Sequence, residues 1–137
     1  MTFVDTSVWV ESLRRRESPE ARELERLLDA DGVALAVPVR LEILSGAGAG
    51  ERARLARLLS ALPTFEPTHA TWATMESWIA VAARKGERFG VADLLVAALA
   101  AENGGDVWSR DGDFARMAAL GFARLHVPAP GDDRPEA

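Results

Sequence analysis

The stretch TFVDTSVW, residues 2–9, decides how the rest of the chain is expected to fold. Residues 2–5 form a short apolar run that predicts a buried strand, and it ends at Thr6 and Ser7, which are good N-terminal caps for a following helix. Asp5 therefore stands at the carboxyl end of a strand, where a helix begins. A chain that begins this way is expected to alternate strands with helices.

Strand-like and helix-like segments do alternate along the whole chain. Further strands are predicted at residues 33–37, 64–66, 106–109 and 123–127. Helices are predicted at residues 9–13, 19–32, 38–46, 55–62, 72–86, 91–102 and 113–120. This order implies an α/β fold, in which a central and mostly parallel sheet of four or five strands is covered by helices on both faces, with right-handed crossovers.

Size and composition indicate one globular domain. The chain has 137 residues, of which 48% are hydrophobic, so it can bury a substantial core. The domain is expected at residues 1–127, followed by a flexible polar tail at 128–137. The sequence has no cysteine, which excludes disulfides and thiolate metal sites and fits a reducing, cytoplasmic location.

Charge limits the ways in which the protein could bind a polyanion. The net charge of -5 argues against a broad basic surface that would hold nucleic acid by its phosphates alone. A local patch at Arg14, Arg15 and Arg16 remains. We favour reading it as a solvated helix end over a phosphate contact, because arginines there complement the helix dipole.

Several side chains are assigned to the core or the surface from their spacing alone. In the helix at 72–86 the inward residues are expected to be Trp72, Met75, Ile79 and Ala82, while Trp78 lies off this stripe and could serve an interface. Val91 is placed on the core face of the next helix. Neither His69 nor His126 has metal-pair spacing, and His126 is read as a surface residue at a strand end.

Four acidic residues, far apart in the chain, each lie where a hydrophobic stretch meets a turn or a helix start. They are Asp5 in FVDTSVW, Glu42 in VRLEILSG, Asp93 in GVADLLVAA and Asp111 in WSRDGDF. In open parallel sheets, ligands bind beyond the carboxyl ends of the strands. Asp5 and Asp111 follow predicted strands, and Glu42 and Asp93 fall in early helical turns that could face the same rim. Their placement predicts one shared acidic pocket.

Such a pocket needs a cation. Two ionised carboxylates about 4 Å apart repel each other by about 4 kcal/mol at an effective dielectric constant near 20. Ligand sets made only of oxygen favour Mg²⁺ or Mn²⁺ over zinc. A metal held in this way lowers the pKa of a bound water and neutralises charge on a phosphoryl group, which suits phosphodiester hydrolysis. Taken singly, each aspartate could instead be a helix cap.

Taken together, these motifs resemble the PIN-domain ribonucleases of the VapC toxin type. The resemblance rests on DTSVW, a glutamate followed by Gly46, ADLLVAALA and WSRDGDF, and it spans nearly the whole chain. It implies a PIN-like three-layer α/β/α sandwich. It also implies Mg²⁺ as the cofactor, with Mn²⁺ as the alternative, RNA as the substrate, a cognate VapB-type antitoxin and a homodimer.

The resemblance assigns roles to individual residues. The acids that hold the metal and activate water correspond to Asp5, Glu42, Asp93 and Asp111, with Asp5 and Asp93 the firmest metal ligands. Supporting roles fall to Thr6, Ser109 and Asp113. Ser109 stands where the family often has threonine, so a hydroxyl is retained. Either Asp111 or Asp113 could be the fourth acid; we prefer Asp111, which is nearer the strand end, and expect Asp113 to cap the next helix.

Three functions stay open on the sequence. The first is a metal-dependent endoribonuclease that acts as a toxin. The second is a housekeeping PIN-type nuclease for RNA processing, and the third is a non-enzymatic module whose acidic rim receives an arginine from a partner. A phosphoacceptor domain is disfavoured, because it would need a lysine near the acids and Lys85, the only lysine, lies at the end of a long helix.

Overall fold

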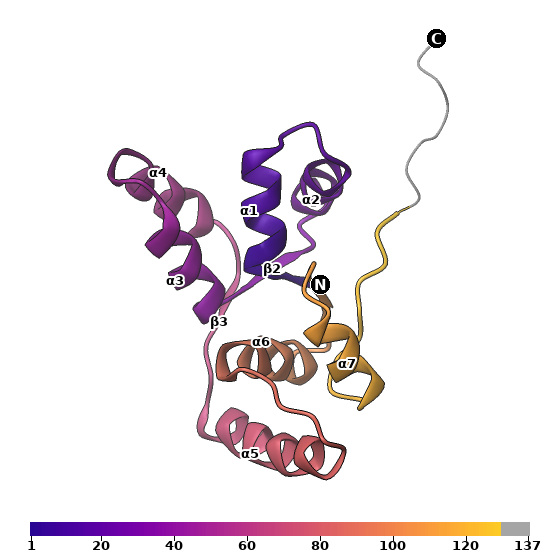
Figure 1. Cartoon of the computed structure of the whole chain (residues 1–137). Coiled ribbons are helices and arrows are strands. Elements are labelled where there is room, and N and C mark those ends of the chain that lie inside the picture. The colour runs from indigo at the N-terminus through magenta and orange to yellow at the C-terminus, as the bar shows by residue number, and fades with distance from the viewer. Residues whose placement is uncertain (130–137) are drawn as a thin grey trace.

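The structure, a computed structural model, describes residues 1–129 (Figure 1). Its central sheet has four strands in the order β3-β2-β1-β4, and every pair of neighbours is parallel. The strands are β1 (Thr2–Val4), β2 (Val33–Ala36), β3 (Thr64–Phe65) and β4 (Asp106–Trp108). The prediction of a central parallel sheet is therefore confirmed, with four strands. The expected tail falls largely at residues 130–137, outside the described residues.

Seven helices in the described residues cover this sheet. They are α1 (Thr6–Arg14), α2 (Pro19–Asp29), α3 (Val37–Gly46), α4 (Ala49–Leu59), α5 (His69–Arg84), α6 (Val91–Glu102) and α7 (Asp113–Ala119). Figure 1 shows α1 and α2 on one side of the strands and α6 on the other, with α5 outermost beneath α6. The chain thus forms three layers. Within residues 1–129, no helix has the length and apolar character needed to cross a bilayer.

Helix α6 forms the centre of the core. All seven of its residues from Leu94 to Ala100 are buried, as expected for a helix that is apolar on all sides and enclosed between layers. Val91 was expected in the core but is 63% exposed, because the first turn projects beyond the sheet edge. After the helix, Gly105 packs against Phe3, whose ring would lie 2.8 Å from any added Cβ. This close approach admits only glycine.

The predicted inward face of α5 is half correct. Met75 and Ala82 are buried, but Trp72 and Ile79 are 46% and 49% exposed. Trp78, expected off the stripe, instead stacks on Phe122 with ring centroids 4.6 Å apart and an interplanar angle of 5°. Because bulky apolar residues lie on both sides of this helix, periodicity alone could not identify the side that faces α6.

Residues 123–127 do not form the expected last strand. Leu125 makes one isolated parallel bridge with Val107. The Val107 N–H donates to the Arg124 carbonyl, and the His126 N–H donates to the Val107 carbonyl, both at 2.8 Å. Pro128 has no N–H with which to extend this pairing, so the contact stops after two hydrogen bonds.

His126 is not the surface residue that we expected. Its side chain is 10% exposed, and its Nε2 lies 3.0 Å from the Oε1 of Glu23 on α2. The Trp108 ring packs beside it, with centroids 5.4 Å apart. Hydrogen bonds from Arg26, more than the one with His126, lower the pKa of Glu23 to about 2. The contact between His126 and Glu23 therefore holds the end of the domain against α2.

Candidate metal centre

The candidate site lies at the carboxyl edge of the sheet, where β1 and β4 end side by side. Val4 pairs with Trp108 in register, so Asp5 and Ser109 are the first residues beyond the two strand ends. The Asp5 N–H donates to the Trp108 carbonyl at 2.8 Å. Parallel pairing thus brings together two residues that are 104 positions apart in the chain.

Two hydroxyl groups orient the carboxylate of Asp5. Its Oδ2 accepts hydrogen bonds from Ser109 Oγ at 2.7 Å and from Ser7 Oγ at 3.0 Å. Asp5 itself occupies the N-cap position of α1 and makes no side-chain capping bond, so the prediction that Thr6 or Ser7 is the cap is wrong. The Thr6 hydroxyl is buried without a hydrogen-bond partner in the described residues. Ser7, rather than Thr6, therefore supports Asp5.

The same hydroxyls hold the next segment of backbone. The Arg110 N–H donates to Ser7 Oγ, and the Asp111 N–H donates to Ser109 Oγ, each at 3.0 Å. The two serine hydroxyls are themselves 3.2 Å apart. This small network fixes the turn that carries Asp111 against the start of α1.

Three carboxylates gather beside this network. Asp93, Asp111 and Asp113 each offer one oxygen, and these oxygens all lie within 4.8 Å of one another. Asp111 Oδ1 accepts the Asp113 N–H at 2.9 Å, and Gly112 occupies the N-cap position of α7, so Asp113 does not have the capping role that we expected. Asp113, the first residue of α7, also accepts a hydrogen bond from Arg116. Both candidates for the fourth acid are therefore in the cluster.

The pKa of Asp93 shows that the remaining acids lie nearby. Burial is the largest cause of its rise to about 6, followed by the negative charges of Asp5, Asp111, Asp113 and Glu42, in that order. Glu42 is exposed and lies outside the three-carboxylate group. The structure thus brings Asp93, Asp111 and Asp113 together, whereas Asp5 and Glu42 lie outside this group and act on Asp93 through their charge.

Sequence reasoning undervalued two members of this site. The sequence leaves open whether Asp111 or Asp113 is the fourth acid and favours Asp113 as a cap, although the spacing D-G-D places both carboxylates on one turn. Ser7 was treated as a cap as well. Its bridging position depends on Ser109, and no local pattern reveals that contact.

The donor set fits a hard divalent cation. Ionised carboxylates about 5 Å apart repel one another by about 3 kcal/mol per pair at an effective dielectric constant near 20. The repulsion that raises the pKa of Asp93 would be relieved by a cation held among Asp93, Asp111 and Asp113. Carboxylate oxygens without nitrogen or sulfur donors suit Mg²⁺ or Mn²⁺.

Comparisons with known proteins agree with this geometry. The PIN domain family matches residues 2–120. Ribonuclease VapC11 of Mycobacterium tuberculosis is 38% identical over 125 residues, which cover 88% of this chain and 93% of that relative. Among solved structures, VapBC2 from Rickettsia felis, bound to a DNA fragment from its promoter, has a TM-score of 0.74 at 19% identity and covers 91% of this chain and 96% of its own. A toxin-antitoxin complex from Klebsiella pneumoniae has a TM-score of 0.65 at 17% identity, covering 94% and 98%.

The two structures share the fold with this chain, and the VapC11 match extends over most of both sequences. The resemblance stated from the motifs and the PIN-like sandwich are both confirmed. The chain belongs to the PIN domain family, among its VapC ribonucleases.

Proposed function

We propose that this protein is a Mg²⁺-dependent endoribonuclease that hydrolyses RNA phosphodiester bonds and acts as the toxin of a VapBC-type pair in the cytoplasm. One observation carries the proposal: the oxygens of Asp93, Asp111 and Asp113 lie within 4.8 Å of one another at the carboxyl edge of the sheet. The similarity to VapC11, whose name describes a ribonuclease, supports RNA as the substrate.

The acidic residues have different roles at this site. Asp93, Asp111 and Asp113 would hold the cation. When bound, Mg²⁺ supplies a lowered water pKa and positive charge beside the phosphoryl oxygens. Asp5, held in one orientation by Ser7 and Ser109, positions the reacting water. Glu42, whose side chain is exposed, would pass a proton to solvent.

The proton on Asp93 competes with the cation. Because burial and four neighbouring acids raise its pKa to about 6, Asp93 is largely protonated below that pH in the metal-free protein. Metal binding must displace this proton. We therefore expect cation affinity to rise with pH across this range.

An apolar groove between helices α1 to α4 supports an antitoxin partner. It has a volume of about 520 Å³ and is lined by α1, α2, the middle of α3 and α4, with Leu13, Leu28 and Leu58 among its apolar residues. Trp9 and Ser12 also line it. An antitoxin segment with apolar side chains would fill this groove.

The apolar groove favours the toxin function over the two alternative functions, a housekeeping nuclease and a non-enzymatic module. A housekeeping RNA-processing nuclease would use the same acids but needs no partner on an apolar groove. A non-enzymatic module would use the groove but would not need three converging carboxylates. Only the toxin of a two-protein pair uses both features.

The experiment compares RNA cleavage by purified wild type and by Asp93→Asn and Asp113→Asn, with Mg²⁺ and with EDTA. We expect EDTA to abolish cleavage and each variant to lose about 100-fold or more, because even changes behind the metal ligands cost 10- to 100-fold. Asp29→Asn, an exposed acid at the end of α2, is the matched control and should cleave normally. Intact RNA in the wild-type reaction, with growth arrest unaltered by Asp93→Asn, would reject the proposal.

A further inference from the structure

We propose that Arg110 and Arg15 form a phosphate-binding subsite for the RNA strand, beside the acid cluster but away from the bond that is cut. This inference rests on the proposed function and adds the path along which the bound RNA strand extends from the metal centre. The two arginines meet at Glu11, in a hollow of about 600 Å³ between the end of α1, the start of α2 and the turn after β4.

Arg110 is fixed to the metal centre by its own backbone. It stands between Ser109 and Asp111, and its N–H donates to Ser7 Oγ at 3.0 Å. Its side chain leaves this anchored point and places Nη1 2.8 Å from Glu11 Oε2. A group bound by this guanidinium would therefore lie at a constant distance from the acids.

A stripe along α1 continues from the acids to the second arginine. Ser7, Glu11 and Arg15 are spaced i, i+4, i+8, so they share one face of the helix. Four residues of helix advance about 6 Å, which is comparable to the span of one extended nucleotide. Arg15 Nε lies 3.5 Å from Glu11 Oε1. A strand that leaves the acid cluster along this stripe would bring successive phosphates to Arg110 and then to Arg15.

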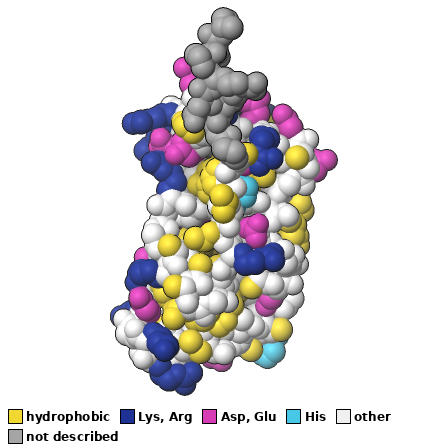
Figure 2. Space-filling view, turned by 90° about the vertical axis from the view of Figure 1, so that its right-hand side faces the viewer, with side chains coloured by type: hydrophobic (Ala, Val, Ile, Leu, Met, Phe, Trp, Pro, Cys, Tyr) yellow, Lys and Arg dark blue, Asp and Glu magenta, His cyan; other side chains and the backbone are white. Residues whose placement is uncertain are grey.

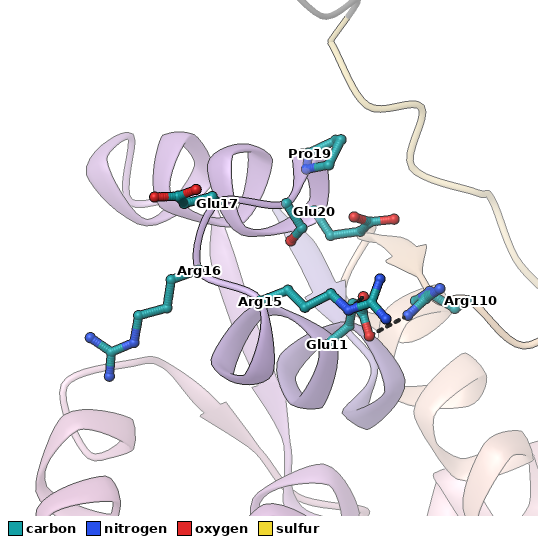
Figure 3. Close-up of a pocket in the computed structure, with 8 residues that line it drawn as sticks. Glu11, Arg15, Arg16, Glu17, Pro19, Glu20 and Arg110 are labelled. Atoms are coloured by element: carbon teal, nitrogen blue, oxygen red, sulfur yellow. Dashed lines mark ion pairs between the residues drawn. The ribbon is translucent and has the colours of Figure 1, made fainter.

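The local charge favours an anion. Two guanidinium groups share the single carboxylate of Glu11, whose side chain is 17% exposed, while those of Arg110 and Arg15 are 47% and 77% exposed. Arginine has five N–H donors, and these ion pairs leave several of them facing solvent. Figure 3 shows the Arg15 and Arg110 side chains converging on Glu11, whereas Arg16 points away.

The rest of the hollow is less favourable, and this limits where a phosphate can bind. Glu17 and Glu20 also line it, and neither forms an ion pair within the described residues. The favourable position is therefore the side of Arg110 and Arg15, near α1. A hollow of this size matches pockets that accept small ligands, so one nucleotide unit fits beside the arginine pair.

Two other arginines, Arg116 and Arg52, are held by structural contacts. Arg116 is paired with both Glu87 and Asp113. Arg52 donates to the backbone carbonyls of Leu44 and Ala47 at 3.0 and 2.9 Å. The five carboxylates at the metal centre repel a polyanion, so a substrate strand needs cationic groups close by. Arg110 and Arg15 are placed to supply them.

The test measures binding of a fluorescently labelled, mixed-sequence single-stranded RNA by the full chain, in Ca²⁺ and across a series of salt concentrations. We expect Arg15→Ala/Arg110→Ala to bind about tenfold more weakly, and the slope of log affinity against log salt to fall by about 1.4, because each phosphate contact on a single strand contributes about 0.7. In Mg²⁺, cleavage of total RNA should show a raised KM and an unchanged kcat.

Two controls separate this role from a structural one. Arg54→Ala removes an arginine of similar exposure, 51%, which also makes a 2.8 Å ion pair with a glutamate, and it should bind RNA like the wild type. Glu11→Gln/Arg15→Ala/Arg110→Ala removes the carboxylate that the double variant leaves unpaired. It should fold normally and show the same loss of RNA affinity and salt slope.

The outcomes are distinct. Affinity and slope equal to those of Arg54→Ala would overturn the subsite. Weaker antitoxin binding with unchanged RNA binding would overturn it too, and would assign the arginines to an acidic partner segment. If the substitutions weaken RNA binding as expected but the wild type leaves RNA intact in Mg²⁺, the proposed function is contradicted and the subsite is retained.

Discussion

Asp93 is the residue on which the chemistry of the site depends most directly. Burial, reinforced by four neighbouring carboxylates, raises its pKa to about 6 in the metal-free protein, against an ordinary value of 3.8. Between these two pH values the unfolded chain has lost the proton that the folded chain retains. Rising pH therefore favours the unfolded state over this interval.

The metal-free protein should accordingly lose stability as pH rises from about 4 to about 6. Asp93→Asn cannot ionise and should lack this component. Thermal unfolding of both proteins in EDTA, measured at several pH values, checks this through the difference between their Tm values. If the Tm values of the wild type and Asp93→Asn change with pH in the same way, the raised pKa does not belong to Asp93. Added Mg²⁺ at neutral pH should raise the Tm of the wild type more than that of Asp93→Asn.

Helices α1 to α4 have a role separate from that of the metal centre. They form an apolar groove in which Leu13 and Leu58 are 42% and 57% exposed, large values for leucines that face a common hollow. Exposed apolar patches of this kind mark binding sites. The residues that line the groove do not include any of the three carboxylates of the acid cluster, so we expect that partner binding and catalysis can be altered separately.

Leu13→Asp/Leu58→Asp should weaken antitoxin binding at least about tenfold, because truncating an apolar anchor at an interface typically costs more than 1 kcal/mol. RNA cleavage without antitoxin should not change. Titration calorimetry with the proposed VapB-type antitoxin provides the measurement. Leu125→Asp changes a leucine that is also 42% exposed but lies outside the groove, and it should bind normally. Equal affinity for both variants would place the antitoxin elsewhere.

At the scale of the whole molecule, the surface carries charges of both signs. Figure 2 shows basic and acidic side chains interspersed over one face, with hydrophobic side chains between them. Helix α5 lies outermost in Figure 1 and exposes Trp72 and Ile79. These residues are seven positions apart, about two turns, so they share a face. We propose that this face pairs two copies of the chain.

Light scattering of the purified chain should then give a dimer mass, and Trp72→Glu/Ile79→Glu should give a monomer that still cleaves RNA. Charges introduced on an apolar interface face are left without partners and oppose association. Val127→Glu alters a residue that is 82% exposed on another part of the surface and should leave the dimer intact. A monomeric wild type would contradict the homodimer itself.

Much of the secondary structure could be predicted, because its signals are local. The run VADLLVAALAAE predicts the helix at 91–102 with the bounds that the structure shows, and Pro19 marks the start of α2 correctly. The missed features depend on distant contacts. Residues 123–127 look strand-like but make one bridge, and His126 looks exposed but is buried against Glu23.

The sequence by itself determined the alternation of strands and helices, the parallel sheet and the edge at which the acids gather. The reason is that period, capping and chain order act over short distances, and parallel strands align their carboxyl ends. Only the tertiary structure decided that Asp113 joins Asp93 and Asp111, that Ser7 and Ser109 share Asp5, and that Arg110 meets Arg15 at Glu11. Those contacts depend on the packing of α1 against the turn after β4, which joins residues about a hundred positions apart.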